Sequence, residues 1–136
     1  MSLVLDSSTT LAWYFADEQT ASALALLNQV ADLGAVAPII WRFEVANGLR
    51  VALRRKRINS AYRDHALAKL AELDVAIDEE SSAHAWSATV RLADRHSLTV
   101  YDASYLELAQ RRRLPLATVD AALAQAAQAE GIGVPQ

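Results

Sequence analysis

The sequence predicts an α/β protein, a three-layer α/β/α sandwich with a central parallel sheet. Short β-forming runs alternate with longer segments of helical periodicity, which is the pattern of parallel strands covered by helices. Only four glycines are present and 53% of the residues are hydrophobic, which favours helices around one core. Because 136 residues are too few for two sizeable domains, we expect a single domain over residues 1–136.

Five short apolar runs are expected to form the strands. In chain order they are residues 3–5, 35–37, 75–77, 116–118 and 132–134, and Pro38 closes the second run. The segments between them carry the periodicity of amphipathic helices. The expected helices run from the first strand to about residue 33, and then over 41–57, 60–73, 82–95, 101–112 and 120–129. In the segment 82–95, Trp86, Val90 and Ala93 share one helical face.

The composition excludes several classes of protein. The absence of cysteine rules out a disulfide scaffold, a thiolate zinc site and a cysteine nucleophile. No apolar run approaches the roughly 20 residues that span a bilayer, and Asp6 comes too early for a secretory signal. We therefore expect a soluble, cytoplasmic protein with no membrane partner. The net charge of −3 excludes a uniformly basic coat for nucleic acid.

Four acidic residues are expected to meet at the carboxyl ends of the strands, where open parallel sheets form their binding crevice. Asp6 follows the first strand, Glu44 lies in the first turn of the helix after the second, and Asp120 follows the fourth. Asp102 joins them if its helix starts on the same side. Its place within an apolar stripe demands a cation, a ligand or a capping role, because a carboxylate is rarely buried alone.

Simpler structural roles remain open for each acid. Asp6 and Asp120 both precede a helix, where a carboxylate can cap free backbone amides. Glu44 and Asn47 follow one another along the flank of an amphipathic helix, where they can be a solvated pair. Asp102 can serve within the first turn of its own helix.

A convergence of four carboxylates favours a divalent cation. Carboxylates without a basic neighbour repel one another and raise each other's pKa, and a hard ion such as Mg²⁺ or Mn²⁺ removes this conflict. Ser8 and Thr118 stand two residues from an acid and are expected to support it. Such ions assist attack on a phosphodiester, so the pattern favours metal-assisted hydrolysis of nucleic acid.

The remaining polar residues suggest contacts rather than a second site. His65, His84 and His96 share no ligand spacing, so zinc is not expected. A basic stretch includes the four residues Arg54, Arg55, Lys56 and Arg57. Such a run is commonly a solvated surface. Beside an acidic metal site, however, we expect it to bind RNA phosphates, because nucleic-acid substrates need contacts outside the catalytic pocket.

Several motifs occur in a fixed order along the chain. They are VLDSS followed by LAWYFADE, then PIIWRFEVANGL, RRKRIN, LTVYDASYLELAQRRRLPLATVD and a closing AAQAEGI. Their combination of an acid after the first strand, E-x-x-N, Y-D-A-x-Y and T-x-D is far more specific than any single element. Through these motifs the sequence resembles the PIN-domain family, specifically the VapC-type toxins of bacterial type II toxin–antitoxin modules, over nearly its whole length.

This resemblance implies an Mg²⁺- or Mn²⁺-dependent endoribonuclease with a PIN-like α/β/α sandwich. It assigns catalysis and metal binding to Asp6, Glu44, Asp102 and Asp120, with support from Ser8, Asn47 and Thr118. It also implies a homodimer and inhibition by a small antitoxin whose tail enters the acidic pocket.

Two other classes of protein compete with this interpretation. A catalytically silent interaction module on the same fold would have lost at least one pocket acid, whereas all four are present. A receiver-type phosphoacceptor domain needs a lysine at a late strand end. The two lysines, Lys56 and Lys69, both fall in expected helices, which disfavours this class.

Overall fold

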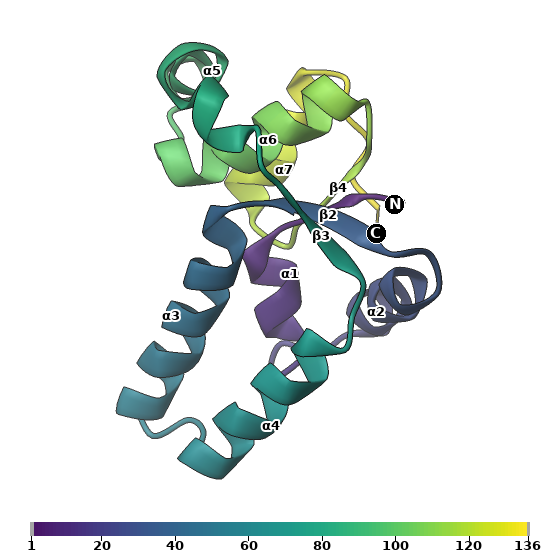
Figure 1. Ribbon diagram of the computed structural model, residues 1–136, viewed down its shortest axis with the longest axis vertical. Coiled ribbons are helices and arrows are strands. Elements are labelled where there is room, and N and C mark those ends of the chain that lie inside the picture. Colours follow the sequence, from purple (N-terminus) through teal and green to yellow (C-terminus); the bar gives the residue numbers. More distant parts are fainter. Residues whose placement is uncertain (1, 136) are drawn as a thin grey trace.

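The computed structural model describes residues 2–135 and contains a four-stranded parallel sheet (Figure 1). The strands are β1 (Val4–Leu5), β2 (Ala35–Pro38), β3 (Val75–Asp78) and β4 (Leu116–Ala117), in the order β3-β2-β1-β4. Val4 pairs with Val36 of β2 on one side and with Leu116 of β4 on the other. The central parallel sheet expected from the sequence is therefore confirmed.

Helices cover both faces of this sheet. One side carries α5 (Val90–His96), α6 (Val100–Arg112) and α7 (Ala121–Ala129), and the other carries α1 (Ser7–Ala12), α2 (Ala21–Leu33), α3 (Ile40–Arg54) and α4 (Ser60–Ala71) (Figure 1). This arrangement is the three-layer α/β/α sandwich that the sequence predicts. Within residues 2–135, every helix is too short or too polar to cross a membrane.

The helical segment after β1 is interrupted, contrary to the expectation of continuous helix to residue 33. α1 ends at Ala12, and α2 begins only after Thr20, whose side chain accepts a hydrogen bond from the Ala23 amide at 3.0 Å. The indole of buried Trp13 donates to the Ala23 carbonyl at 2.8 Å. Tertiary packing of Trp13 therefore stabilises a turn where the local pattern alone favours helix.

Two further expectations are wrong. Residues 132–134 form no strand, although the Leu116 amide donates to the Gly133 carbonyl at 2.9 Å. Gly133 and Pro135 are both unfavourable in a strand, so the pairing does not continue beyond this one hydrogen bond. The expected helix 82–95 consists of a 3₁₀ turn (Ser81–His84), a π turn (Ala85–Thr89) and α5. The wider π turn changes the helical register, and Trp86 is 96% exposed whereas Ala93 is buried.

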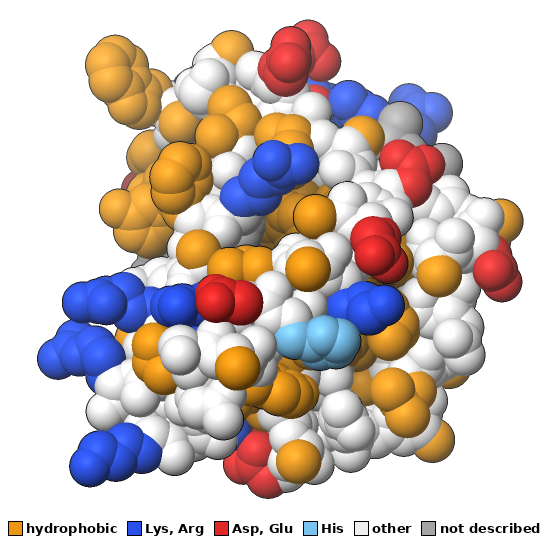
Figure 2. Space-filling model, turned by 60° about the horizontal axis from the view of Figure 1, so that its bottom comes forward, with side chains coloured by type: hydrophobic (Ala, Val, Ile, Leu, Met, Phe, Trp, Pro, Cys, Tyr) orange, Lys and Arg blue, Asp and Glu red, His pale blue; other side chains and the backbone are white. Residues whose placement is uncertain are grey.

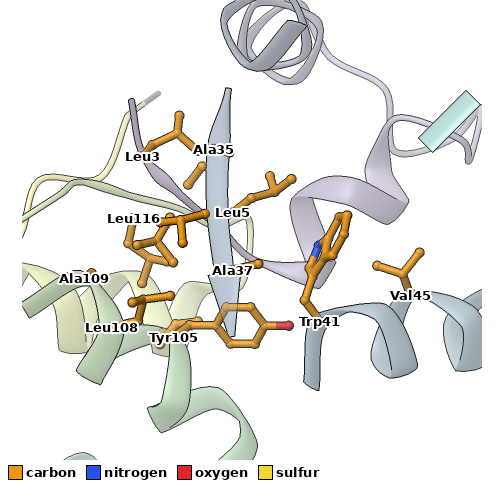
Figure 3. Packing of buried hydrophobic residues seen from close by; sticks show 14 of the residues in the cluster. Leu3, Leu5, Ala35, Ala37, Trp41, Val45, Tyr105, Leu108, Ala109 and Leu116 are labelled. Atoms are coloured by element: carbon orange, nitrogen blue, oxygen red, sulfur yellow. The ribbon is translucent and has the colours of Figure 1, made fainter. Parts of the chain in front are cut away.

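The hydrophobic core fixes α3 and α6 relative to the sheet. Figure 3 shows Tyr105 and Leu108 of α6 close to the strands, and Trp41 and Val45 at the start of α3. All four are buried, and each fully buried large side chain contributes roughly 1.5–3 kcal/mol. Because these buried side chains hold both helices against the core, Glu44 on α3 and Asp102 on α6 have defined positions.

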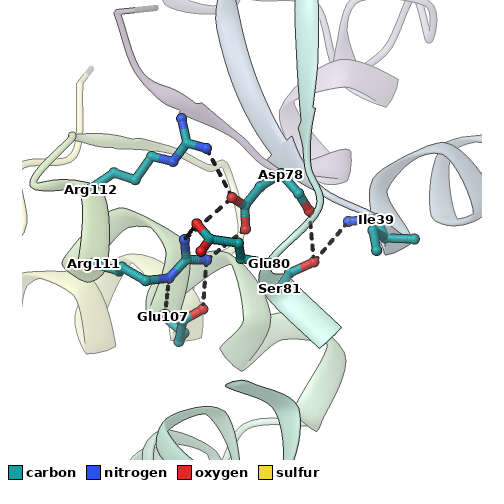
Figure 4. Close-up of polar contacts among 7 residues, drawn as sticks. All are labelled: Ile39, Asp78, Glu80, Ser81, Glu107, Arg111 and Arg112. Carbon is teal, nitrogen blue, oxygen red and sulfur yellow. Dashed lines mark hydrogen bonds and ion pairs between the residues drawn. The ribbon is translucent and has the colours of Figure 1, made fainter. Parts of the chain in front are cut away.

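An ion cluster ties the end of β3 to the C-terminal half of α6 (Figure 4). The Asp78 carboxylate, 0% exposed, binds Nη2 of Arg111 at 2.6 Å and Nη2 of Arg112 at 2.9 Å. Arg111 also binds Glu107 at 2.8 Å. Burial alone would raise the pKa of Asp78, but hydrogen bonds and charge from the two arginines outweigh burial and lower it.

Candidate active site

Asp6 is the most buried of the four acids predicted to form the site. It follows β1 directly, is 2% exposed, and occupies the cap position of α1 without a side-chain capping bond. Its Oδ2 accepts hydrogen bonds from the Thr118 hydroxyl at 2.7 Å and from the Ser8 hydroxyl. The capping alternative for Asp6 is therefore wrong, and hydroxyl groups solvate its carboxylate instead.

Glu44, on α3, lies in the same region. It is half-buried in the first turns of α3, and its Oε1 accepts from the Tyr105 hydroxyl at 2.6 Å and the Ser7 hydroxyl at 3.2 Å. One turn further along α3, Gly48 lies so close to Leu11 that an added Cβ would overlap the Leu11 side chain. The missing side chain at residue 48 lets α1 and α3 approach, which brings Glu44 to Ser7.

Asp102 and Asp120 stand at two helix starts. Asp102 lies in the first turn of α6, where its amide donates to the Thr99 hydroxyl at 3.0 Å. Asp120 is the cap of α7: its Oδ1 accepts from the Leu123 amide at 2.9 Å, and its own amide donates to Thr118 Oγ1 at 3.0 Å. The capping role predicted as an alternative for Asp120 is confirmed. The capping bond uses only Oδ1, one of the two carboxylate oxygens.

The four acids influence one another electrostatically. Burial raises the pKa of Asp6 to about 6, opposed by the hydrogen bonds from Ser8 and Thr118 and assisted by the charges of Asp102 and Glu44. Burial also raises the pKa of Asp102, together with the charges of Asp120 and Glu44. Burial is the larger cause of both raised pKa values, and the charges of the neighbouring acids add to it.

The donor set of this site fits a hard divalent cation. Among the residues described, no three acidic or histidine side chains surround a single point closely enough to form a complete protein cage. Mg²⁺ does not require one, because it commonly keeps several waters and binds through one or two carboxylates. Among the ion pairs of residues 2–135, none neutralises Asp6, Glu44, Asp102 or Asp120.

Not every residue assigned from the sequence joins this cluster. Ser8 and Thr118 bind Asp6 as expected, whereas Asn47 is exposed one turn after Glu44. Arg54 lies at the other end of α3, about 15 Å from Glu44 at 1.5 Å per residue. Figure 2 shows basic side chains gathered along one edge of the face that it displays.

Within the basic cluster Arg57 has partners of its own. α3 ends at Arg54, so Arg55, Lys56 and Arg57 follow the helix rather than extend it to residue 57. The Arg57 guanidinium binds Asp17 at 2.8 Å and Glu18 at 3.1 Å, and lies 4.3 Å from the ring centroid of Phe15. Arg54, Arg55 and Lys56 are exposed.

Ser7 and Tyr105 are polar residues of the site that had no role assigned from the sequence, although both lie within its motifs VLDSS and Y-D-A-x-Y. Tyr105 stood in the apolar stripe of its helix, where a ring is expected to pack in the core. The available signal was its place one turn after Asp102, on the same helical side. Nothing in the sequence pairs it with Glu44, which is 61 residues away.

The parallel sheet and the acids beyond its carboxyl edge define an α/β/α domain of the PIN type. Residues 3–129 match the family model described as PIN domain, and the chain therefore belongs to the PIN-domain family. Within the family it is of the VapC type: it is 32% identical over 125 residues to Ribonuclease VapC3 of Pyrobaculum aerophilum, covering 92% of this chain and 94% of that protein. The predicted resemblance is confirmed.

A solved structure supports the same fold. PAE2754 from Pyrobaculum aerophilum aligns with a TM-score of 0.68 over 93% of this chain and 84% of that chain. At 22% sequence identity this likeness concerns the fold alone.

Proposed function

We propose that the chain is a divalent-metal-dependent endoribonuclease that acts as the toxin of a type II toxin–antitoxin system. The observation that carries this proposal is the buried Asp6 carboxylate, which has hydroxyl partners on both oxygens and the charges of Glu44 and Asp102 nearby. The similarity to a protein named a ribonuclease supports RNA as the substrate. The retention of all four acids favours this proposal over a catalytically silent interaction module.

In this proposal Asp6, Glu44, Asp102 and Asp120 would hold Mg²⁺ or Mn²⁺. Ser8 and Thr118 orient Asp6, and backbone and hydroxyl donors hold one oxygen each of Asp120 and Glu44. When bound, the ion would activate water for attack on the phosphodiester and stabilise charge on the leaving oxygen. Without it, the four carboxylates repel the phosphates of the substrate.

Phosphate contacts outside the pocket are proposed for the cluster Arg54, Arg55, Lys56 and Arg57. Exposed guanidinium and ammonium groups bind phosphate oxygens and position a nucleic acid without reading its sequence. The ion pairs of Arg57 with Asp17 and Glu18 compete with such a contact, so we assign most of the phosphate binding to the other three residues.

The partners follow from membership of the VapC type. We propose a cognate antitoxin that blocks the acidic pocket, an RNA substrate, a homodimer and a cytoplasmic location. Gel filtration with light scattering tests the dimer. Coexpression with the gene immediately upstream tests the antitoxin: that gene is expected to restore growth of cells that the chain inhibits.

The activity itself is tested with purified protein and a labelled single-stranded RNA. We expect cleavage with Mg²⁺ or Mn²⁺, none with chelator, and none with Asp6→Asn, which removes the charge of the buried acid. The matched control is Asp32→Asn, because Asp32 is exposed on α2. Equal cleavage by the wild type and Asp6→Asn, or undiminished cleavage in chelator, contradicts the proposal.

A further inference from the structure

Tyr105 places a polar group inside the core at the edge of the acidic site. The residue is 0% exposed, yet its hydroxyl lies 2.6 Å from Oε1 of Glu44. A buried phenol normally needs a hydrogen-bond partner, and here that partner is an acid of the site rather than a backbone carbonyl. A phenylalanine would fill the same space without this bond, so core packing alone does not explain the hydroxyl.

The bond connects two helices from opposite layers of the sandwich. Tyr105 belongs to α6, whereas Glu44 belongs to α3. In Figure 3 the Tyr105 hydroxyl points toward the start of α3, marked by Trp41. The phenol therefore reaches past the sheet to the helix that presents Glu44.

Within residues 2–135, both hydrogen bonds of the Glu44 carboxylate involve the same oxygen. Oε1 accepts from Tyr105 at 2.6 Å and from Ser7 at 3.2 Å. Two donors from different elements fix the plane of the carboxylate and direct its other oxygen, Oε2, away from them. Partners of this kind orient metal ligands, and their loss typically weakens metal binding by 10–100-fold.

We propose that Tyr105 is a positioning residue that holds Glu44 through Oε1, so that Oε2 serves as the ligand oxygen for the divalent cation. This inference rests on the proposed metal-dependent function. Ser7 is the second, weaker member of the same arrangement, because its contact is longer and it is not fully buried.

The test is Mn²⁺ binding by calorimetry to the wild type and Tyr105→Phe, with no RNA present. We expect the dissociation constant of Mn²⁺ to be about tenfold larger for the variant, since the ring remains and only the hydroxyl is lost. Tyr62→Phe is the matched control: its hydroxyl donates to the Tyr14 carbonyl at 2.7 Å, away from the acids, and its loss should leave Mn²⁺ affinity unchanged.

A double-mutant cycle separates positioning from a general effect on the fold. In a Glu44→Gln background, Tyr105→Phe should cause no further loss of Mn²⁺ affinity, because the group through which it acts is already gone. Ser7→Ala removes the other donor without changing the core and should weaken Mn²⁺ binding several-fold, which supplies the test if Tyr105→Phe fails to fold.

The outcomes distinguish this inference from the proposed function. Wild-type Mn²⁺ affinity in folded Tyr105→Phe, or an equal loss in the Glu44→Gln background, overturns the role of Tyr105 and leaves the metal site standing. A wild-type protein that binds no Mn²⁺ overturns both.

Discussion

Thr118 donates a hydrogen bond of 2.7 Å to Asp6 across the ends of the neighbouring strands β4 and β1, although 112 residues separate the two in the chain. The same hydroxyl accepts the Asp120 amide at 3.0 Å. One side chain thus stabilises the charge of one acid and the backbone position of another. This double contact makes Thr118 the most direct point at which to perturb the site without removing a carboxylate.

Thr118→Val should shift the pH dependence of cleavage to higher pH. The bond from Thr118 lowers the pKa of Asp6, so its loss should raise that pKa further above about 6. A hydrogen bond to a charged group is worth about 1.5–3 kcal/mol, which corresponds to roughly one pKa unit or more. The measurement is the pH–rate profile, with Thr118→Ser as the control that keeps the hydroxyl. Identical profiles for the Val and Ser variants would contradict this role.

Asp6→Asn should stabilise the metal-free protein at neutral pH. Because the folded-state pKa of about 6 exceeds the ordinary value of 3.8, the native chain binds the proton more tightly than the unfolded chain does. The contribution of Asp6 to the free energy of unfolding is therefore greatest below pH 4 and falls as pH rises through 6, by up to about 3 kcal/mol. Urea unfolding in chelator at pH 4 and pH 7 checks this. A variant less stable than the wild type at pH 7 would refute it.

Asp102→Asn should separate stability from activity. The raised pKa of Asp102 indicates that its charge is unfavourable in the metal-free fold, so its removal should raise the melting temperature in chelator while abolishing cleavage. Mg²⁺ at a hundredfold excess over its dissociation constant should stabilise the wild type by about 2.7 kcal/mol and the variant by less. Thermal melts measure both effects, with exposed Asp94→Asn as the control. Destabilisation of the metal-free variant by more than about 1 kcal/mol would instead assign Asp102 a capping role.

Replacing Arg54 and Arg55 by alanine should weaken RNA binding in a salt-dependent manner. Each lost phosphate contact reduces the slope of log affinity against log salt by roughly 0.7 for single strands, so the pair should flatten it by about one unit or more. Arg57→Ala should have a smaller effect, because Asp17 and Glu18 already pair with that guanidinium. Filter binding at several salt concentrations tests this, with exposed Arg91→Ala as the control. An unchanged slope would indicate that the cluster is a solvated surface or binds the antitoxin instead of RNA.

Asp78→Asn should destabilise the fold without changing Mn²⁺ affinity. Removing the buried carboxylate breaks the ion pairs of Asp78 with Arg111 and Arg112, and breaking a buried ion pair costs about 3 kcal/mol. The lowered pKa of Asp78 means that this stabilisation is present above pH 3.8 and is lost as pH falls through the folded-state pKa. Urea unfolding at pH 7 and at acidic pH measures it, and Glu79→Gln, an exposed neighbour, is the control. A variant as stable as the wild type at pH 7 would show that the arginines find other partners.

The sheet and the placement of the acids could be predicted because both depend on local patterns. Strands such as 75–77 are short apolar runs, and an acid placed directly after a parallel strand, as Asp6 is, must lie at the carboxyl edge. The break after α1 and the π turn before α5 could not be predicted, since tertiary contacts override helical periodicity there. Exposure of Trp86 follows from that π turn.

A single sequence could not predict which distant residues contact one another. Helix packing, not spacing along the chain, determines the hydrogen bond between Tyr105 and Glu44 and the ion pair between Arg57 and Asp17. The capping alternatives show the same limit. Asp6 and Asp120 both precede a helix, but only Asp120 caps it with its side chain, whereas both oxygens of Asp6 accept from hydroxyl groups.

The pairing of β4 with β1 has a consequence for the synthesis of this protein. The first strand leaves the ribosome long before its neighbour at residues 116–117 and the acid at residue 120. Until then Asp6 lacks its Thr118 donor and the pocket lacks one of its four acids. The proposed RNA cleavage would therefore begin only after residue 120 has been synthesised, so shorter nascent chains would lack a complete site.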